Sequence, residues 1–254
     1  MARSPGRRPI SRSRFAPTSL KAPLAAPSPD APKRRTLYGR SKGKALRRRQ
    51  AELIANALPA LEIETERLAA GAPLFAAQPS ELWLEIGFGG GEHLIAQALA
   101  NPEIGLIGCE PFINGVAKAL AGVERHRLAN VRLQTGDARL LLGATPTATL
   151  SRIFILYPDP WPKRRHHKRR LISNETVAEL ARIAKSGAEV RFATDIDDYA
   201  GWTLARFLAS PDFRWLAESA NDWRTPWDGW APTRYEAKAL AAGRAPVYLT
   251  FQRR

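Results

Sequence analysis

The chain has 254 residues, 44% of them apolar, and a formal net charge of +15. That apolar content suffices for one sizeable hydrophobic core. The single cysteine excludes an internal disulfide framework and a zinc site built on several cysteines. The four histidines show no metal-ligand spacing, and no apolar run approaches the roughly 18 residues of a membrane span, so we expect neither a metal nor a membrane partner.

The positive charge is concentrated at the N-terminus. The first 51 residues hold 15 of the 39 Lys and Arg residues and one acid, Asp30, whereas the remainder holds 24 basic and 23 acidic residues. Residues 1–35 are rich in Arg, Ser, Pro and Ala, which predicts a disordered basic tail that adds affinity for phosphates. An organelle transit peptide of the same composition is the alternative, although frequent prolines would interrupt its helix. Residues 36–254 are then one domain.

The first part of that domain predicts a helix, a strand and a glycine-rich turn. A helical apolar pattern begins around Lys44 and stops at Pro59. Residues 82–86 read as a buried strand that ends in Gly87, Gly89 and Gly91, followed by a helix over residues 92–99. The glycine spacing differs from the dinucleotide fingerprint. A carboxylate at the strand end, Glu85, would repel a pyrophosphate but could bind the ammonium group of an amino-acid moiety.

Acidic residues also follow the next two predicted strands. Residues 104–109 lead to Glu110, about 20 residues after the glycine turn, which is the distance at which an acid reaches the ribose hydroxyls of a bound nucleoside. A helix over residues 114–126 and a third strand, residues 131–134, precede Asp137, which could meet an adenine edge. Alternatively, each of these acids caps the helix that follows it.

The fourth predicted strand, residues 153–156, leads into the most distinctive segment of the chain. Three prolines between positions 158 and 162 stop both helix and sheet, so the chain should leave the sheet as a stiff loop. That loop carries Asp159 and Trp161 and is followed by six Lys or Arg and two His in residues 163–170. Ligands of open α/β sheets bind outside the carboxyl ends of the strands. The combination suits a nucleobase attached to phosphates; a solvated basic loop with a tryptophan covering the sheet edge is the alternative.

The remaining pattern completes an α/β fold. Ser173 should cap a helix that closes at Gly187, and a strand over residues 189–193 ends at Asp195. A helix over residues 197–208 and two final strands, residues 213–217 and 247–252, follow, and Thr233-Arg234-Tyr235-Glu236 between those strands opens a short helix or forms a capping box. We predict one doubly wound, mostly parallel sheet with antiparallel C-terminal strands.

Several of these motifs occur together in the order found in one known family. They are the segments Leu84–Gly89, Cys109-Glu110, Gly136–Ala138, Pro158–Lys163, Arg165–Arg170, Ala193–Asp195 and Thr233–Glu236. Over residues 36–254 the chain resembles the bacterial tRNA (guanine-N7)-methyltransferases, which have the Rossmann-like class I fold of S-adenosylmethionine-dependent methyltransferases. Two departures from the family pattern are Pro162, where histidine is common, and the long N-terminal tail.

The resemblance implies a function and a set of site residues. The implied activity is methyl transfer from S-adenosylmethionine to N7 of guanine 46 in the variable loop of tRNA, by a cytoplasmic enzyme that we expect to be a monomer, with a homodimer as the alternative. It implies a catalytic role for Asp159 and cofactor contacts at Glu85, Gly87, Glu110, Asp137 and Asp159. It implies substrate contacts at Lys163, Arg165, Lys168, Arg169, Arg170, Asp195, Thr233, Arg234, Tyr235 and Glu236.

Two other functions fit the same sequence. One is methylation of an exocyclic amine of a nucleobase, because such enzymes also place a polar residue, a proline and an aromatic residue after the fourth strand. The other is a noncatalytic RNA-binding protein that retains a methyltransferase-like fold. The acids at the expected strand ends favour an enzyme over the second alternative. Whether Trp161 stacks on the target base or only supports the loop is left open by the sequence.

Overall fold

The computed structural model describes Met1, Tyr38, Gly39, Ser41 and residues 43–254, and residues 37–254 form one compact unit. The predicted tail, residues 1–35, lies outside the described residues apart from Met1. Its disorder, its phosphate affinity and the alternative of a transit peptide therefore stay predictions.

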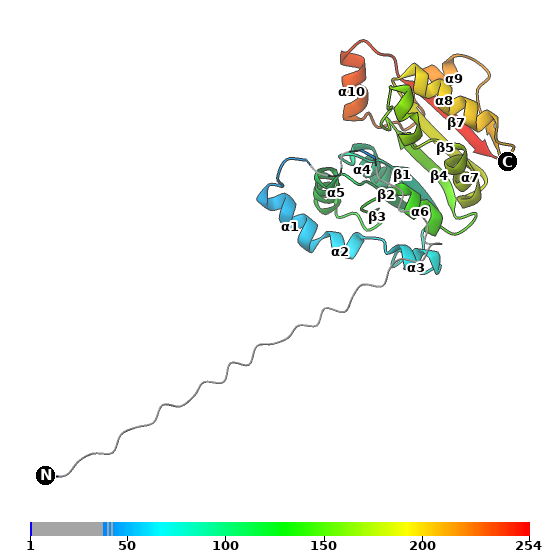
Figure 1. Ribbon diagram of the computed structural model, residues 1–254. Helices are drawn as coiled ribbons and strands as arrows, with labels where there is room; N and C mark the ends of the chain where they lie inside the picture. Colours follow the sequence, from blue (N-terminus) through cyan, green and yellow to red (C-terminus); the bar gives the residue numbers. More distant parts are fainter. Residues whose placement is uncertain (2–37, 40, 42) are drawn as a thin grey trace. The chain divides into compact units, whose positions relative to one another are not determined.

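The compact unit is built on a seven-stranded sheet of order β3-β2-β1-β4-β5-β7-β6 (Figure 1). Strands β1 to β5 run parallel, whereas β7 is antiparallel to both β5 and β6. The strands are β1 Glu81–Ile86, β2 Ile104–Cys109, β3 Val131–Gln134, β4 Leu150–Leu156, β5 Ala184–Thr194, β6 Phe213–Trp215 and β7 Val247–Arg253. This arrangement confirms the predicted doubly wound, mostly parallel sheet with antiparallel C-terminal strands.

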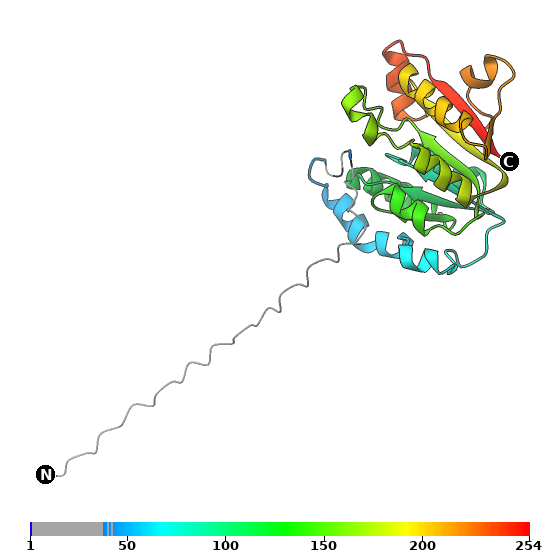
Figure 2. The same ribbon diagram turned by 45° about the vertical axis from the view of Figure 1, so that its right-hand side comes forward.

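Helices cover both faces of the sheet. The helices are α1 Arg48–Asn56, α2 Leu58–Leu61, α3 Thr65–Ala69, α4 Glu92–Ala100, α5 Ile113–His126, α6 Ala138–Ala144, the 3-10 helix η1 Arg164–Arg169, α7 Asn174–Ile183, α8 Asp197–Leu208, α9 Asn221–Arg224 and α10 Arg234–Ala241. Helices α6, α7 and α8 lie over one face (Figure 2), and apolar residues of α1, α4 and α5 pack on the other.

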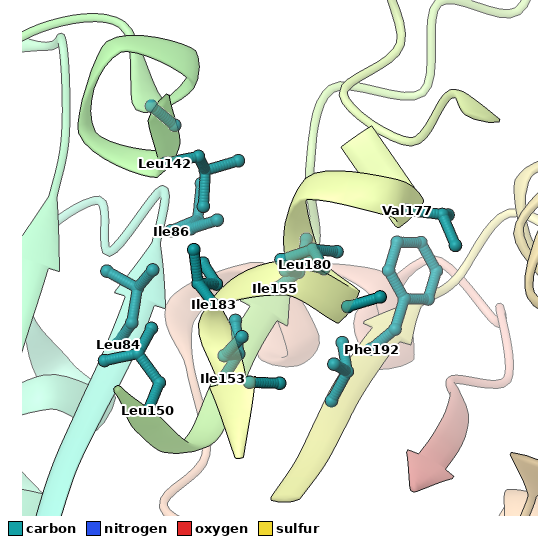
Figure 3. Close-up of a cluster of buried hydrophobic side chains, with 14 of the residues drawn as sticks. Leu84, Ile86, Leu142, Leu150, Ile153, Ile155, Val177, Leu180, Ile183 and Phe192 are labelled. Atoms are coloured by element: carbon teal, nitrogen blue, oxygen red, sulfur yellow. The ribbon is translucent and has the colours of Figure 1, made fainter. Parts of the chain in front are cut away.

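The alternation of side chains along β4 shows how both faces are buried. Ile153 and Ile155 belong to one core cluster, whereas Phe154 belongs to the other, because successive side chains of a strand point to opposite faces. Figure 3 shows Leu180 and Ile183 of α7 pointing toward Ile153 and Ile155. Strands buried on both sides read as continuous apolar runs, which is why β2 and β4 were recognisable from the sequence.

Several predicted boundaries are wrong. Strand β4 begins at Leu150 rather than at residue 153, β6 ends at Trp215 rather than at residue 217, and two helix boundaries differ as follows. The helix expected from Lys44 begins at Arg48, ends at Asn56, and is followed by the short α2, which has Pro59 in its first turn, where a missing N–H is tolerated. Helix α7 ends at Ile183 rather than at Gly187. Ala184 already pairs with Leu150, so β5 begins directly after the helix and Gly187 lies within the strand at φ +81°.

The strand order creates the place where a ligand would bind. Strand β1 lies between β2 and β4, and the chain leaves β1 toward β2 and β3 on one side, while β4 and β5 lie on the other. The carboxyl ends of β1 and β4 therefore flank a topological switch point, which is where ligands of open α/β sheets bind.

Candidate active site

A cavity of about 280 Å³ opens at this switch point. Its volume is close to the lower end of the roughly 300–1,000 Å³ typical of small-molecule sites. It is lined by Tyr38, Gly39, Ile86, Gly87, Cys109, Glu110, Pro111, Phe112, Gly136, Asp137, Ala138, Arg139, Tyr157, Pro158, Asp159, Trp161, Arg169, Arg170, Leu171 and Tyr235. Segments that are far apart in the sequence therefore meet at one site.

The glycine-rich turn after β1 contributes Gly87 to the lining of the cavity. Gly87 has φ +77°, and a Cβ placed on it would meet no atom within 4 Å, so the backbone there is open to a ligand. Gly89 lies under α5 so closely that a Cβ on Gly115 would come within 2.1 Å of the Gly89 carbonyl oxygen. The turn therefore combines a conformation that glycine adopts without strain with close approach of backbone and helix.

Glu110, at the end of β2, both lines the cavity and holds the glycine turn. Its Oε2 accepts a hydrogen bond of 2.7 Å from the Gly89 N–H, and its Oε1 accepts one of 2.8 Å from the Phe112 N–H. Desolvation by burial raises the pKa of this carboxyl, while the two backbone donors oppose that rise. Because each carboxylate oxygen has two lone pairs, Glu110 keeps acceptor capacity for a ligand hydroxyl.

Asp137 is both a helix cap and a residue of the cavity, the two roles between which the sequence did not decide. It is the N-cap of α6, accepting a 3.0 Å hydrogen bond from the Arg139 N–H, and it also lines the cavity. The Arg139 side chain donates to both oxygens of the Asp137 carboxylate. The cap fixes the carboxylate at the edge of the cavity without excluding a ligand contact.

Unlike Glu110, Asp137 and Asp159, Glu85 does not line the cavity. Its side chain is 3% exposed and its Oε2 lies 2.8 Å from Nδ1 of the buried His93 in α4. The neighbouring Ile86 lines the cavity instead. The structure thus places Glu85 with His93, and its contact with a cofactor ammonium stays a prediction.

Asp159 is the acid at the end of β4. It is solvent-accessible at the cavity, yet desolvation by surrounding protein raises the pKa of its carboxyl. Within the described part of the chain it makes no hydrogen bond and no ion pair. On either side of it, Tyr157 and Trp161 have left-handed backbones, with φ of +50° and +43°. Left-handed backbone conformations strain non-glycine residues, and such strained residues are concentrated at functional sites.

Trp161 lies among aromatic and cationic groups at the cavity. Its ring is edge-on to Tyr38, with centroids 6.5 Å apart, and the Arg169 guanidinium lies 5.0 Å from the Trp161 ring centroid and 4.9 Å from that of Tyr38. Trp161 thus supports the loop, and it also contributes to the cavity wall. Tyr38 had no sequence signal, because it precedes the first periodic element.

The basic run 163–170 divides into exposed and buried members. Lys163, Arg165 and Lys168 are exposed on or beside η1, as expected for groups that meet phosphates. Arg170 is different, because its side chain has no exposed surface and pairs with Asp198 of α8. Arg170 nevertheless contributes to the lining of the cavity, and its predicted contact with RNA stays a prediction.

The predicted substrate residues after β5 also form internal contacts. Asp195 pairs with Arg244, with 2.6 Å between Oδ2 and Nε. Thr233 caps α10 by accepting from the Glu236 N–H. The Glu236 carboxylate is buried and accepts hydrogen bonds from Trp230 Nε1, at 2.8 Å, and from the Tyr248 hydroxyl.

The first turn of α10 reaches the cavity. Tyr235 lines it and is 42% exposed. Side-chain atoms of Tyr235 and Arg234 lie 3.1 and 3.2 Å from the position that a Cβ on Gly89 would occupy. The structure therefore brings the start of α10 against the glycine turn, although about 145 residues separate them in sequence.

In the described ranges, no helix is both long and apolar enough to cross a membrane. No cluster of three or more His, Cys, Asp or Glu side chains suitable for a metal ion occurs in the part of the chain that the structure describes.

The fold and the cavity define a class, the α/β methyltransferases. Residues 79–249 match the family model described as "Putative methyltransferase". TrmN from Thermus thermophilus, a solved structure, shares the fold with a TM-score of 0.50 and 15% identity over 82% of this chain and 53% of that one.

Closer relatives identify the family. The curated tRNA (guanine-N(7)-)-methyltransferase of Nitrobacter winogradskyi is 50% identical over 220 residues, which is 86% of each chain. That of Bradyrhizobium diazoefficiens is 52% identical over 221 residues, covering 86% of this chain and 94% of the relative. The chain belongs to the tRNA (guanine-N7)-methyltransferase family.

Proposed function

We propose that this protein transfers a methyl group from S-adenosylmethionine to N7 of a guanine in tRNA. The observation that carries the proposal is Asp159, a carboxylate without a partner among the described residues, between the cavity and the exposed cations of η1. The relatives' shared name supplies the substrate and the atom modified. A nucleobase bound beside Asp159 would have its backbone phosphates near Lys163 and Arg165.

The residues around the cavity fit S-adenosylmethionine. The open backbone at Gly87 accommodates close approach of a ligand, and Glu110 and Asp137 offer acceptors for hydroxyl and amino groups at adjacent strand ends. Ile86 and Phe112 add apolar surface for a flat ring. When bound, the cofactor supplies an electrophilic methyl group, which the in-plane lone pair of guanine N7 can accept without prior loss of a proton.

Because no proton has to be removed before transfer, we expect the protein to act mainly by alignment and electrostatics. Well-oriented groups in intramolecular reactions contribute up to roughly 7–11 kcal/mol. The guanine ring becomes cationic when N7 is methylated, so a carboxylate at Asp159 stabilises the charge that develops. The raised pKa of Asp159 reflects its desolvated surroundings, in which such an interaction is stronger than in water.

The proposal also includes the position of the target guanine in the tRNA and the form of the enzyme that acts on it. The family resemblance supports guanine 46 of the variable loop as the target and a cytoplasmic enzyme. The expected acting form is a monomer, with a homodimer as the alternative. Exocyclic-amine methylation is the competing outcome, since it would use the same cavity and give a different nucleoside.

The test is incubation of the purified full chain with unmodified tRNA and labelled S-adenosylmethionine, followed by identification of the methylated nucleoside. We expect 7-methylguanosine, and none from Asp159→Ala. A tRNA transcript with adenine at position 46 is the matched control for the site. Label in an N2-methylated guanine or an N6-methylated adenine would overturn the proposed atom, and label in the control transcript would overturn the position.

A further inference from the structure

The loop that carries Asp159 has few ways to be held in place. Pro158, Pro160 and Pro162 have no backbone N–H, so this segment offers mainly carbonyl oxygens for anchoring. Tyr157 and Trp161 are held in left-handed conformations at φ +50° and +43°. Strained residues persist only where surrounding groups determine the conformation, so some donor must hold the loop.

Arg170 is that donor. Its Nε donates a 2.8 Å hydrogen bond to the Pro160 carbonyl oxygen, one residue from Asp159. Its Nη2 donates to the Asp198 carboxylate at the start of α8. The guanidinium carbon lies 4.8 Å from the Tyr199 ring centroid and 4.9 Å from that of Trp202, so two aromatic rings of α8 enclose it.

The same helix holds the chain just after Arg170. Trp202 Nε1 donates a 2.8 Å hydrogen bond to the Ile172 carbonyl oxygen. The Ile172 N–H in turn donates to the Tyr199 hydroxyl oxygen, at 3.4 Å. The pKa of Asp198 is lowered, chiefly by its hydrogen bond from Arg170. Helix α8 therefore holds Ile172 directly and Pro160 through Arg170, and η1 lies between these two points in the sequence.

We propose that Arg170 is a positioning residue for Asp159 and not an RNA ligand. It acts through the Pro160 carbonyl oxygen and fixes the loop against Asp198. This division separates Arg170 from Arg165, which lies five residues earlier in the same basic run and is exposed. The kinetic part of the inference rests on the proposed function.

Arg170→Lys is the sharpest variant, because lysine keeps the charge but lacks the planar fork that binds Pro160 and Asp198 together. We expect kcat to fall about 10- to 100-fold, since a displacement near 1 Å can cost that much. The equilibrium affinity for tRNA and the slope of its salt dependence should stay as in the wild type. Asp198→Asn, which alters the same contact from the other side, should give a smaller loss of kcat in the same direction.

Arg165→Ala is the matched control within the basic run. Removing one phosphate contact should weaken tRNA binding and reduce the salt slope by about 1, with a smaller effect on kcat than Arg170→Lys. If Arg170→Lys instead reduces the salt slope as Arg165→Ala does, Arg170 binds RNA and the inference is wrong. Wild-type kcat in Arg170→Lys would also overturn it.

Amide hydrogen exchange tests the positioning without any methyl transfer. Peptides covering residues 157–172, which include the hydrogen-bonded amides of Tyr157, His166 and Arg170, should exchange severalfold faster in Arg170→Lys and Asp198→Asn than in the wild type and Arg165→Ala. Unchanged exchange in both variants would refute the inference. If the wild type methylates no tRNA, the proposed function fails, while this measurement still decides whether Arg170 holds the loop.

Discussion

The two sides of the cavity use their polar residues differently. On the side formed by the loop after β4, Asp159 has no partner among the described residues, and Lys163, Arg165 and Lys168 are exposed. On the side formed by the glycine turn and α10, the polar groups hold the protein together: Glu110 accepts two backbone N–H groups and Glu236 accepts from two side chains.

The difference indicates a division of labour at the site. Polar groups without a partner in the protein can replace their bound water by a substrate. Polar groups that already accept hydrogen bonds from the backbone or from side chains instead fix the shape of the cavity. Substitutions on the first side should therefore impair catalysis or RNA binding with little loss of stability. Substitutions on the second side should lower stability together with ligand affinity.

The largest effect is expected from Asp159→Ala. Methyl transfer should be abolished, while the melting temperature should not fall, because the residue makes no described hydrogen bond and its ionised carboxyl carries a desolvation cost. Single-turnover kinetics and thermal unfolding measure the two quantities. Turnover within about threefold of wild type, roughly 0.65 kcal/mol in the barrier, would remove Asp159 from the mechanism.

The pH dependence gives a second view of Asp159. The pKa of the Asp159 carboxyl is raised above the value near 3.9 that is ordinary for aspartate. On acidification, Asp159 therefore loses its charge at a higher pH than an ordinary aspartate would, and kcat should begin to fall at that higher pH. Stability should respond in the opposite sense. Because the folded-state pKa exceeds the unfolded value, Asp159 and Glu110 destabilise the fold as pH rises through that window, and protonation relieves the penalty.

The second-largest effect on methyl transfer is expected when Arg165, Lys168 and Arg169 are all replaced by Ala. The apparent KM for tRNA should rise and its salt dependence should weaken, because phosphate contacts are lost. The kcat should fall as well, since Arg169 contacts the rings of Trp161 and Tyr38 at the cavity. Kinetics at two salt concentrations with saturating cofactor provide the measurement. Unchanged tRNA parameters would contradict a role for these residues in binding RNA.

Glu110→Ala should weaken cofactor binding more than tRNA binding. The substitution removes the proposed ribose acceptor and leaves the N–H groups of Gly89 and Phe112 without their acceptor, at a cost of about 1–3 kcal/mol each if water cannot replace it. Calorimetry with S-adenosylmethionine measures the affinity, and tRNA binding in the same variant is the control. The prediction fails if cofactor affinity is unchanged.

Glu236→Gln should mainly lower stability. Its new NH₂ group cannot accept, so one of the donors from Trp230 and Tyr248 loses its partner, which costs about 1–3 kcal/mol. Thr233→Ala, which removes the α10 cap, is the comparison and should cost about 1 kcal/mol. Denaturant unfolding measures both. Wild-type stability with weakened tRNA binding would show that Glu236 contacts the substrate instead.

The smallest effect is expected from deleting residues 1–32. If the tail only adds phosphate affinity, the apparent KM for tRNA should rise modestly, more at low salt than at high salt, with little change in kcat. The loop triple variant is the matched comparison. A loss of kcat as large as in that variant would mean that the tail reaches the active site.

The sequence determined the local architecture because its signals are local. Prolines, glycines and continuous apolar runs fix where strands end and turns occur, and β2 and β3 were predicted to the residue. The residues Glu110, Asp137 and Asp159 follow the ends of parallel strands, so their gathering at one edge also follows from strand order. These features require only chain direction and periodicity.

Only the tertiary structure decided what each polar group does there. Glu85 and Ile86 are neighbours in sequence, yet the first lies against His93 and the second lines the cavity, because a strand alternates its side chains between two faces. Arg165 and Arg170 have the same side chain, and only the packing of α8 makes the second a buried anchor. Burial and partner choice depend on contacts between distant segments, which no local pattern encodes.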